Sequence, residues 1–211
     1  MLVLLEALAA YLLGSVSGSL VMGAFRHVDI RESGSGNAGG TNALRTQGWR
    51  FALGVVLIDV GKGALAAGLL PWLGAALAAP GAVPAWAPLV CGFMAVVGHC
   101  YPVWHGFRGG KGAATAVGAL LFIQPVVLIP MILAWLVVLV VTGWVGLATI
   151  VSALTLIPSF YALDAARADF VFSIALALFL VVMHRSNIRR LLAGAENRFE
   201  RIRIVNWFRR D

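Results

Sequence analysis

Charged side chains are scarce in this chain of 211 residues. Asp, Glu, Lys and Arg together make up 12% of it, whereas 61% of its residues are hydrophobic. A water-soluble domain of this size needs a more polar surface, so most of the chain must lie in lipid. Several runs of about 17 or more residues are nearly free of charge, as in membrane-spanning helices. The sequence therefore predicts a polytopic, all-α integral membrane protein that forms a single domain over residues 1–211.

Cysteines and clusters of metal ligands are scarce as well. The two cysteines, Cys91 and Cys100, are nine positions apart on different faces of one expected helix, which argues against a disulfide between them. The four histidines are scattered among few carboxylates, so no metal site is expected. We also expect no other cofactor.

The basic residues are concentrated near the two ends of the chain. Four arginines lie within residues 26–50 and eight within residues 185–210. They flank apolar runs rather than cover a soluble domain, so nucleic-acid binding is not expected. Attraction to anionic lipid and control of topology explain them more simply. By the positive-inside rule, both segments and the loop at 101–112 are cytoplasmic, and residues 185–211 form a basic cytoplasmic tail.

Five apolar runs are predicted to be spans: residues 2–24, 51–70, 85–100, 145–163 and 169–183. A charge-free stretch of 29 residues, 113–141, is longer than the roughly 20 residues that one span needs. As a single span it would place the arginine-rich tail outside. We therefore expect it to break near Gln124-Pro125 into a short helix and a longer one. This gives seven transmembrane helices, with the N-terminus outside, a charge-free outer loop at 71–84, and the C-terminus in the cytoplasm.

A polar, glycine-dense loop at residues 31–48 follows the first span. It holds five glycines, together with Thr41, Asn42 and Arg45. Glycine lets backbone N–H groups approach an anion closely, and Thr41-Asn42 is placed to cap a following helix whose N-terminus attracts anions. This favours an anion cradle with an arginine clamp. The alternative is a flexible loop, in which Gly, Ser and Asn are ordinary turn formers.

Two other polar segments are predicted on the same face. Residues 106–112 read Gly-Phe-Arg-Gly-Gly-Lys-Gly before a helix, which suits phosphate binding with Lys111 as a point charge, or a basic loop that only sets topology. Residues 184–187 read His-Arg-Ser-Asn, where His184 is able to act as acid or base. Taken alone, that segment is better explained by favourable cations at a helix C-terminus. Thr149 is expected near this face.

Ionisable residues also occur inside one predicted span. Asp59 and Lys62 are three positions apart, so they share a helix face. Charges within a bilayer are costly, which favours a role in supporting the site; mutual neutralisation is the alternative. His99, at the cytoplasmic end of the third span, is expected to pack or orient its neighbours.

In their order, and over nearly the whole chain, these segments resemble the bacterial integral-membrane glycerol-3-phosphate acyltransferases that use acyl phosphate as donor. The similar pieces are Gly14-Ser15, Asp29-Ile-Arg31, Gly34-Ser-Gly-Asn37, Thr41-Asn42 with Arg45, Asp59-x-x-Lys62-Gly63, Gly98-His99 with Pro102, Gly109-Gly-Lys-Gly112 and His184-Arg185-x-Asn187-Ile188. The chain also lacks the His-x4-Asp motif of other acyltransferases, as that family does.

The resemblance implies a seven-helix fold in the bacterial inner membrane, with the active site on the cytoplasmic face. It implies transfer of a long-chain acyl group from acyl phosphate to the 1-hydroxyl of sn-glycerol 3-phosphate. The products are 1-acylglycerol 3-phosphate and phosphate, in phospholipid biosynthesis. The expected partners are these two substrates and membrane lipid, and a monomer suffices.

The resemblance also assigns roles to particular residues. The catalytic residues are Ser35, Arg45, Lys111, His184 and Asn187. The substrate-binding residues are Gly36, Asn37, Gly40, Thr41, Asn42, Gly109, Gly110, Gly112 and Thr149, and the supporting residues are Asp59, Lys62 and His99. Trp144 and Gly146 depart from the family, where arginine and serine are common.

Two other functions were weighed. A transporter or channel for an organic phosphate would use the same cationic loops and intramembrane charges. Against it, the polar groups gather on one face, and no paired repeat of interrupted helices is visible. A lipid-binding scaffold without catalysis would not depend on Lys111.

Overall fold

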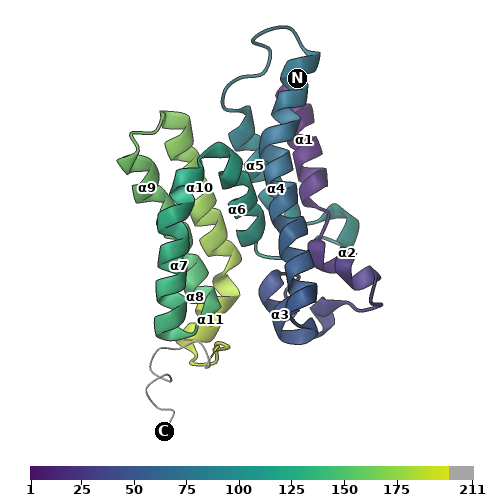
Figure 1. Ribbon diagram of the computed structural model, residues 1–211, viewed down its shortest axis with the longest axis vertical. Helices are drawn as coiled ribbons and strands as arrows, with labels where there is room; N and C mark the ends of the chain where they lie inside the picture. Colours follow the sequence, from purple (N-terminus) through teal and green to yellow (C-terminus); the bar gives the residue numbers. More distant parts are fainter. Residues whose placement is uncertain (200–211) are drawn as a thin grey trace. The chain divides into compact units, whose positions relative to one another are not determined.

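The computed structural model describes residues 1–199, in which every regular element is a helix and loops join the helices (Figure 1). The all-α prediction is confirmed for these residues. Contacts group the chain into two compact units: unit 1 covers Met1–Pro125, and unit 2 begins at Val126. The expected single domain stays a prediction. Four arginines of the expected basic tail, Arg201, Arg203, Arg209 and Arg210, lie outside the described residues.

Unit 1 is built on three long apolar segments and the polar loops that join them. Its helices are α1 (Leu2–Gly14), α2 (Gly18–Ala24), η1 (Ile30–Glu32), α3 (Gly40–Gln47), α4 (Trp49–Leu77), α5 (Ala87–Cys100), η2 (Val103–His105) and α6 (Ala113–Ile123). The first expected span is broken, because α1 and α2 meet at an angle of 46°.

The second expected span is longer than predicted. Pro71 was expected to open the outer loop, yet α4 continues through it to Leu77, so the loop starts at Ala78. Proline removes one backbone donor from a helix, but apolar surroundings leave the rest of the helix no alternative hydrogen-bond partners. Pro71 therefore does not end this helix.

Close packing of small residues joins α4 to α6. A Cβ placed on Gly63 of α4 would lie 3.0 Å from the backbone nitrogen of Ala119, and one on Gly118 of α6 would lie 3.0 Å from that of Ala64. Backbones approach so closely only where side chains are absent, and such contacts drive helix association in lipid. This packing fixes α6 and the polar loop immediately before it.

Unit 2 consists of antiparallel helices joined by short turns. After η3 (Pro125–Val127), it contains α7 (Leu128–Thr142), α8 (Val145–Leu154), α9 (Leu156–Ala162), α10 (Arg167–Met183) and α11 (Arg185–Leu192). The expected break of residues 113–141 is confirmed, since α6 ends at Ile123 and α7 begins at Leu128. Helix α10 bends by 53° into α11, and His184 lies at that bend.

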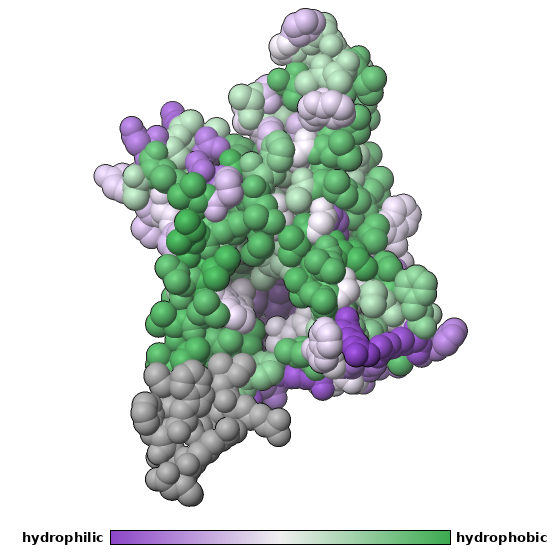
Figure 2. All heavy atoms as spheres, in the orientation of Figure 1, coloured by the Kyte–Doolittle hydropathy of each residue, from purple (hydrophilic) through white to green (hydrophobic). Residues whose placement is uncertain are grey.

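Within residues 1–199, four segments are long and apolar enough to cross a membrane: Trp49–Leu77, Ala87–His105, Pro125–Thr142 and Val145–Ala162. If each bent pair, α1 with α2 and α10 with α11, counts as one span, there are up to six, and α6 is a shorter apolar helix. The seven-span arrangement and its orientation stay predictions. Figure 2 shows hydrophobic side chains along the helices of unit 1 and hydrophilic ones gathered at its α3 end.

Candidate active site

The polar loop that ends in α3 is held in shape by the side chain of Asn42. The buried amide donates hydrogen bonds to the carbonyls of Ile30 (2.8 Å) and Ser33 (3.0 Å), and its oxygen accepts one from the backbone N–H of Ser35 (2.9 Å). An amide suits this position because it both donates and accepts. Asn42 therefore fixes the loop around Ser35.

The predicted capping by Thr41-Asn42 is wrong. Helix α3 begins at Gly40 with Gly39 as its N-cap, and neither Thr41 nor Asn42 caps it, since both lie in its first turn. The loop still ends at a helix N-terminus, with Ser35, Gly36 and Arg45 exposed to solvent. Backbone N–H groups of such a turn attract anions.

Asp59, Lys62 and His99 form a buried ionic cluster in unit 1. Lys62 Nζ is 2.8 Å from Asp59 Oδ1 and 2.8 Å from His99 Nδ1, and Asp59 Oδ1 is 3.3 Å from the same ring nitrogen. Lys62 also donates to the carbonyl of Val16 (2.7 Å), and Asp59 accepts from the N–H of Gly18 (3.1 Å). The two charges neutralise each other and satisfy backbone groups at the break between α1 and α2.

His99 connects the buried ionic cluster to the second polar loop, residues 106–112. Its carbonyl accepts a hydrogen bond from the N–H of Gly110 (3.1 Å), and the carbonyl of Cys100 accepts one from Gly109 (3.2 Å). A Cβ on Gly110 would overlap Nε2 of the His99 ring and lie 2.9 Å from its Cε1, so only glycine fits against it. The residue after this contact is Lys111, and Gly112 is the N-cap of α6. This contact connects Asp59, Lys62 and His99 to the loop of Lys111; their supporting role stays a prediction.

The third polar segment lies in unit 2. His184 is buried at the bend between α10 and α11, with Nδ1 2.8 Å from the carbonyl of Leu180. A carbonyl only accepts, so Nδ1 carries the hydrogen; in the neutral ring, Nε2 is then the nitrogen with a lone pair. The ring is thus held in the tautomer that a proton acceptor at Nε2 requires.

Asn187 is held by a carboxylate that the sequence reasoning missed. Its Nδ2 donates to Glu196 Oε1 (2.7 Å), and Arg190 Nε donates to Glu196 Oε2 (2.7 Å). Glu196 lies beyond Gly194, in the segment expected only to bind lipid. A carboxylate within an arginine-rich stretch was the sequence signal that could have predicted this contact.

Thr149 also lies in unit 2, where it is buried in α8. Its hydroxyl donates to the carbonyl of Val145 (2.9 Å) and lies 3.2 Å from the indole nitrogen of Trp135. These contacts tie α8 to α7, and contact of Thr149 with substrate stays a prediction.

Comparison with known proteins identifies the family of this chain. Residues 4–194 match the family model described as glycerol-3-phosphate acyltransferase. The chain belongs to the glycerol-3-phosphate acyltransferase family. This acyltransferase-family chain is 41% identical to the glycerol-3-phosphate acyltransferase of Symbiobacterium thermophilum, over 91% of this chain and 92% of that protein. It is 43% identical to that of Rhodospirillum rubrum, over 91% and 88% of the two chains.

Solved structures of this family agree in fold. The crystal structure of PlsY, an integral membrane glycerol 3-phosphate acyltransferase, in its glycerol 3-phosphate form matches with a TM-score of 0.83 at 32% identity, over 93% of this chain and 95% of that one. The lysophosphatidic acid form matches with a TM-score of 0.82. The suspected family is thereby confirmed, and this acyltransferase-family chain is a multi-pass membrane protein.

The two departures from the family pattern have structural correlates in this acyltransferase homologue. At Gly146, a Cβ would lie 2.7 Å from Cγ of Asn187, so the glycine makes room for that side chain. At Trp144, the guanidinium of Arg198 lies 4.1 Å from the ring centroid, a cation–π distance. The backbone N–H of Phe199 also donates to the carbonyl of Gly143 (2.9 Å). Residues 195–199 therefore pack back on the start of α8.

Proposed function

We propose that the protein transfers an acyl group from a long-chain acyl phosphate to the 1-hydroxyl of sn-glycerol 3-phosphate. The products are 1-acylglycerol 3-phosphate and inorganic phosphate. The observation that carries the proposal is the match to PlsY, a glycerol 3-phosphate acyltransferase solved in glycerol 3-phosphate and lysophosphatidic acid forms. Those molecules are the acceptor and the product of this reaction. Membership of an acyltransferase family also favours an enzyme over the phosphate transporter that the polar loops alone left open.

The acyl phosphate is already activated, so no covalent enzyme intermediate is required. The hydroxyl oxygen attacks the carbonyl carbon, a carbon–oxygen bond forms, and the bond to the phosphate oxygen breaks with its electron pair. Phosphate leaves with additional negative charge. Lys111 and the N-terminus of α6, which begins after Gly112, stabilise that charge, since preorganised donors act most strongly where charge develops. The N–H groups of Gly109 and Gly110 are bonded to the carbonyls of Cys100 and His99, so these two residues hold the loop in shape.

The phosphate of glycerol 3-phosphate is bound by the loop before α3. Arg45 supplies the charge, and Ser35 (through its hydroxyl), Asn37, Gly40 and Thr41 supply donors. The N–H of Gly36 is bonded to the carbonyl of Ser33, and Asn42 holds the backbone of the loop in place. Asn187 aligns the acceptor, and orientation of this kind accounts for a large share of such catalysis. The proton of the attacking hydroxyl goes to Nε2 of His184 or to a phosphate oxygen of the substrates.

The reaction takes place at the cytoplasmic face of the bacterial inner membrane. The apolar side chains exposed on α4, among them Leu53, Leu57 and Leu65, face the lipid from which the acyl chain comes. The protein needs no metal or cofactor for this chemistry, and a monomer is sufficient.

A donor comparison tests the proposal. Purified protein in detergent is incubated with glycerol 3-phosphate and palmitoyl phosphate, palmitoyl-CoA or palmitoyl acyl carrier protein, and both phosphate and 1-acylglycerol 3-phosphate are measured. Only acyl phosphate is expected to react, with equal amounts of the two products. Lys111→Ala is expected to lower that rate about 10²-fold, as loss of one charge-stabilising group does, whereas Arg50→Ala provides a matched control. Turnover of palmitoyl-CoA alone would refute the donor assignment, and phosphate uptake into vesicles without acylation would favour transport.

Replacing Gly146 by alanine tests the role of Asn187. The new Cβ would displace the Asn187 side chain, so kcat/KM is expected to fall by about tenfold or more, because small misplacements near reacting groups are costly. The measurement is the initial rate with acyl phosphate. Gly61→Ala is the control, since nothing lies within 4 Å of a Cβ at that helical position. Equal rates for the two variants would show that the position of Asn187 does not matter.

A further inference from the structure

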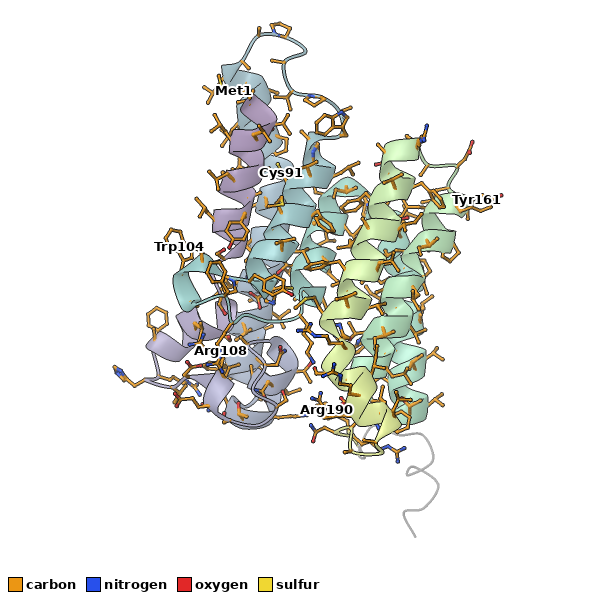
Figure 3. The ribbon with its side chains drawn as sticks, turned by 180° about the vertical axis from the view of Figure 1, so that it is seen from behind. Met1, Cys91, Trp104, Arg108, Tyr161 and Arg190 are labelled. Atoms are coloured by element: carbon orange, nitrogen blue, oxygen red, sulfur yellow. The ribbon has the colours of Figure 1, made fainter. Side chains whose placement is uncertain are left out.

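The side chain of Arg31 joins the two polar loops of unit 1. Its Nη1 donates to the carbonyl of His105 (3.3 Å) and to that of Arg108 (3.2 Å), more than 70 residues along the chain. Arg31 itself lies in η1, directly before the loop that Asn42 holds. One guanidinium therefore fixes the spacing between the loop at 31–48 and the loop that leads to Lys111. Figure 3 shows Arg108 at the end of unit 1 opposite Met1.

Asp29 sets the orientation of this guanidinium. Arg31 Nε lies 3.0 Å from both carboxylate oxygens, Nη2 lies 2.6 Å from Oδ2, and the backbone N–H of Arg31 donates to Oδ1 (2.9 Å). With Nε and Nη2 occupied by the carboxylate, Nη1 points at the two carbonyls. These side-chain hydrogen bonds from Arg31 hold the pKa of the Asp29 carboxyl below its usual value, so the pair stays ionised. Only the planar fork of arginine serves both partners at once.

The segment between the two carbonyls has a strained backbone. Gly106 and Phe107 both have positive φ, of 62° and 60°. For a bulky residue such as Phe107 this conformation is unfavourable and persists only where its surroundings enforce it. The hydrogen bond from Phe107 N–H to the carbonyl of Pro102 (2.9 Å) is one restraint, and the guanidinium is the other.

We propose that Asp29 and Arg31 are positioning residues for Lys111, which hold residues 105–108 in this left-handed turn and thereby place the loop that contacts the substrate phosphate. Breaking the pair releases the turn, so the loop samples conformations that bind phosphate less well. An ordinary surface ion pair contributes little, but this one is bidentate and only partly exposed, at 21% for Arg31 and 29% for Asp29. Its guanidinium also bonds to two carbonyls of the second loop. The kinetic consequence rests on the proposed function; the structural one does not.

Amide hydrogen exchange tests the structural consequence without substrate. In Arg31→Lys, exchange in residues 105–110 is expected to accelerate by about tenfold or more, as when one charge-assisted hydrogen bond is lost. Exchange in α4 and α5 is expected to stay as in the parent, which shows that the fold is intact. Asp29→Asn is expected to act in the same direction but more weakly, because the amide oxygen still accepts from the backbone of Arg31. Arg26→Lys, at an exposed arginine over the Phe51 ring, is the control and is expected to leave the loop unchanged.

Steady-state kinetics test the consequence for binding. In Arg31→Lys, the KM for a phosphate-bearing substrate is expected to rise about tenfold, with a smaller change in kcat, because the loop binds phosphate less well. A merely structural role would reduce the amount of active protein and lower kcat at unchanged KM. Unchanged exchange, or faster exchange with unchanged KM, would overturn the inference. If the parent protein did not use acyl phosphate, the proposed function would be refuted. The exchange experiment uses no substrate, so it would still test whether Asp29 and Arg31 hold the turn.

Discussion

Replacement of His184 by alanine is expected to lower kcat by about 10²–10⁴-fold, with little change in the KM for glycerol 3-phosphate. Loss of a general base has this effect, because the group acts in the transition state rather than on the bound substrate. The hydrogen bond from Nδ1 to the carbonyl of Leu180 leaves Nε2 as the proton acceptor of the neutral ring. The measurement is the rate of phosphate release from palmitoyl phosphate at saturating acceptor.

The control for this experiment is His27→Asn, at an exposed histidine for which no role is proposed. Asparagine suits that position, because the backbone there has a positive φ of 54°. If His184→Ala kept its turnover within about tenfold, the histidine would not be the base. The proton would then go to a phosphate oxygen of the substrate, and Asn187 would be the next residue to test.

Replacement of Lys62 by methionine is expected to destabilise the protein strongly. It leaves Asp59 buried without a counter-charge, which typically costs about 3–5 kcal/mol. For a chain of this length, that corresponds to a fall in Tm of about 10 °C. Thermal unfolding in detergent measures it, and the Val16 carbonyl at the break between α1 and α2 loses its donor at the same time.

The double variant Asp59→Asn with Lys62→Met separates charge from packing. It removes both charges, and the asparagine oxygen still accepts from the N–H of Gly18, so at least half of the lost Tm is expected to return. If the double variant were as unstable as Lys62→Met, the uncompensated charge would not be the cause. The ionic cluster would then matter through its shape alone.

Apolar periodicity and charge placement were enough to predict most helices. The break at Gln124-Pro125 followed from a charge-free run too long for one span, and the structure confirms it. Pro71 misled the prediction because proline is only a local signal, whereas α4 is stabilised along its whole length by apolar surroundings. The bend between α1 and α2 was missed because neither Val16 nor Gly18 carries a sequence signal for it. Their backbone groups bond to Lys62 and Asp59, which lie far along the chain.

Composition predicted the polar loops, but it did not predict which of their residues bind substrate and which hold the loop in shape. Asn42 was expected to bind substrate, and the structure shows its amide bonded to the surrounding loop. Asp29 and Arg31 belonged to the quoted resemblance without any role, because their contacts lie in a distant loop. Glu196 was hidden in a basic stretch. In each case the decisive information is a particular side-chain contact in the folded chain, which composition and spacing alone do not give.

The ionic cluster of α4 also constrains how the protein is assembled in the membrane. A lone helix that carries Asp59 and Lys62 into lipid is penalised by about 2.5–3.5 kcal/mol for each charge near the centre of the bilayer. The partners that remove this penalty come from an earlier segment, at Val16 and Gly18, and from a later one, at His99. During synthesis, α4 therefore leaves the insertion machinery with two of these three partners already present and gains the third only when α5 arrives.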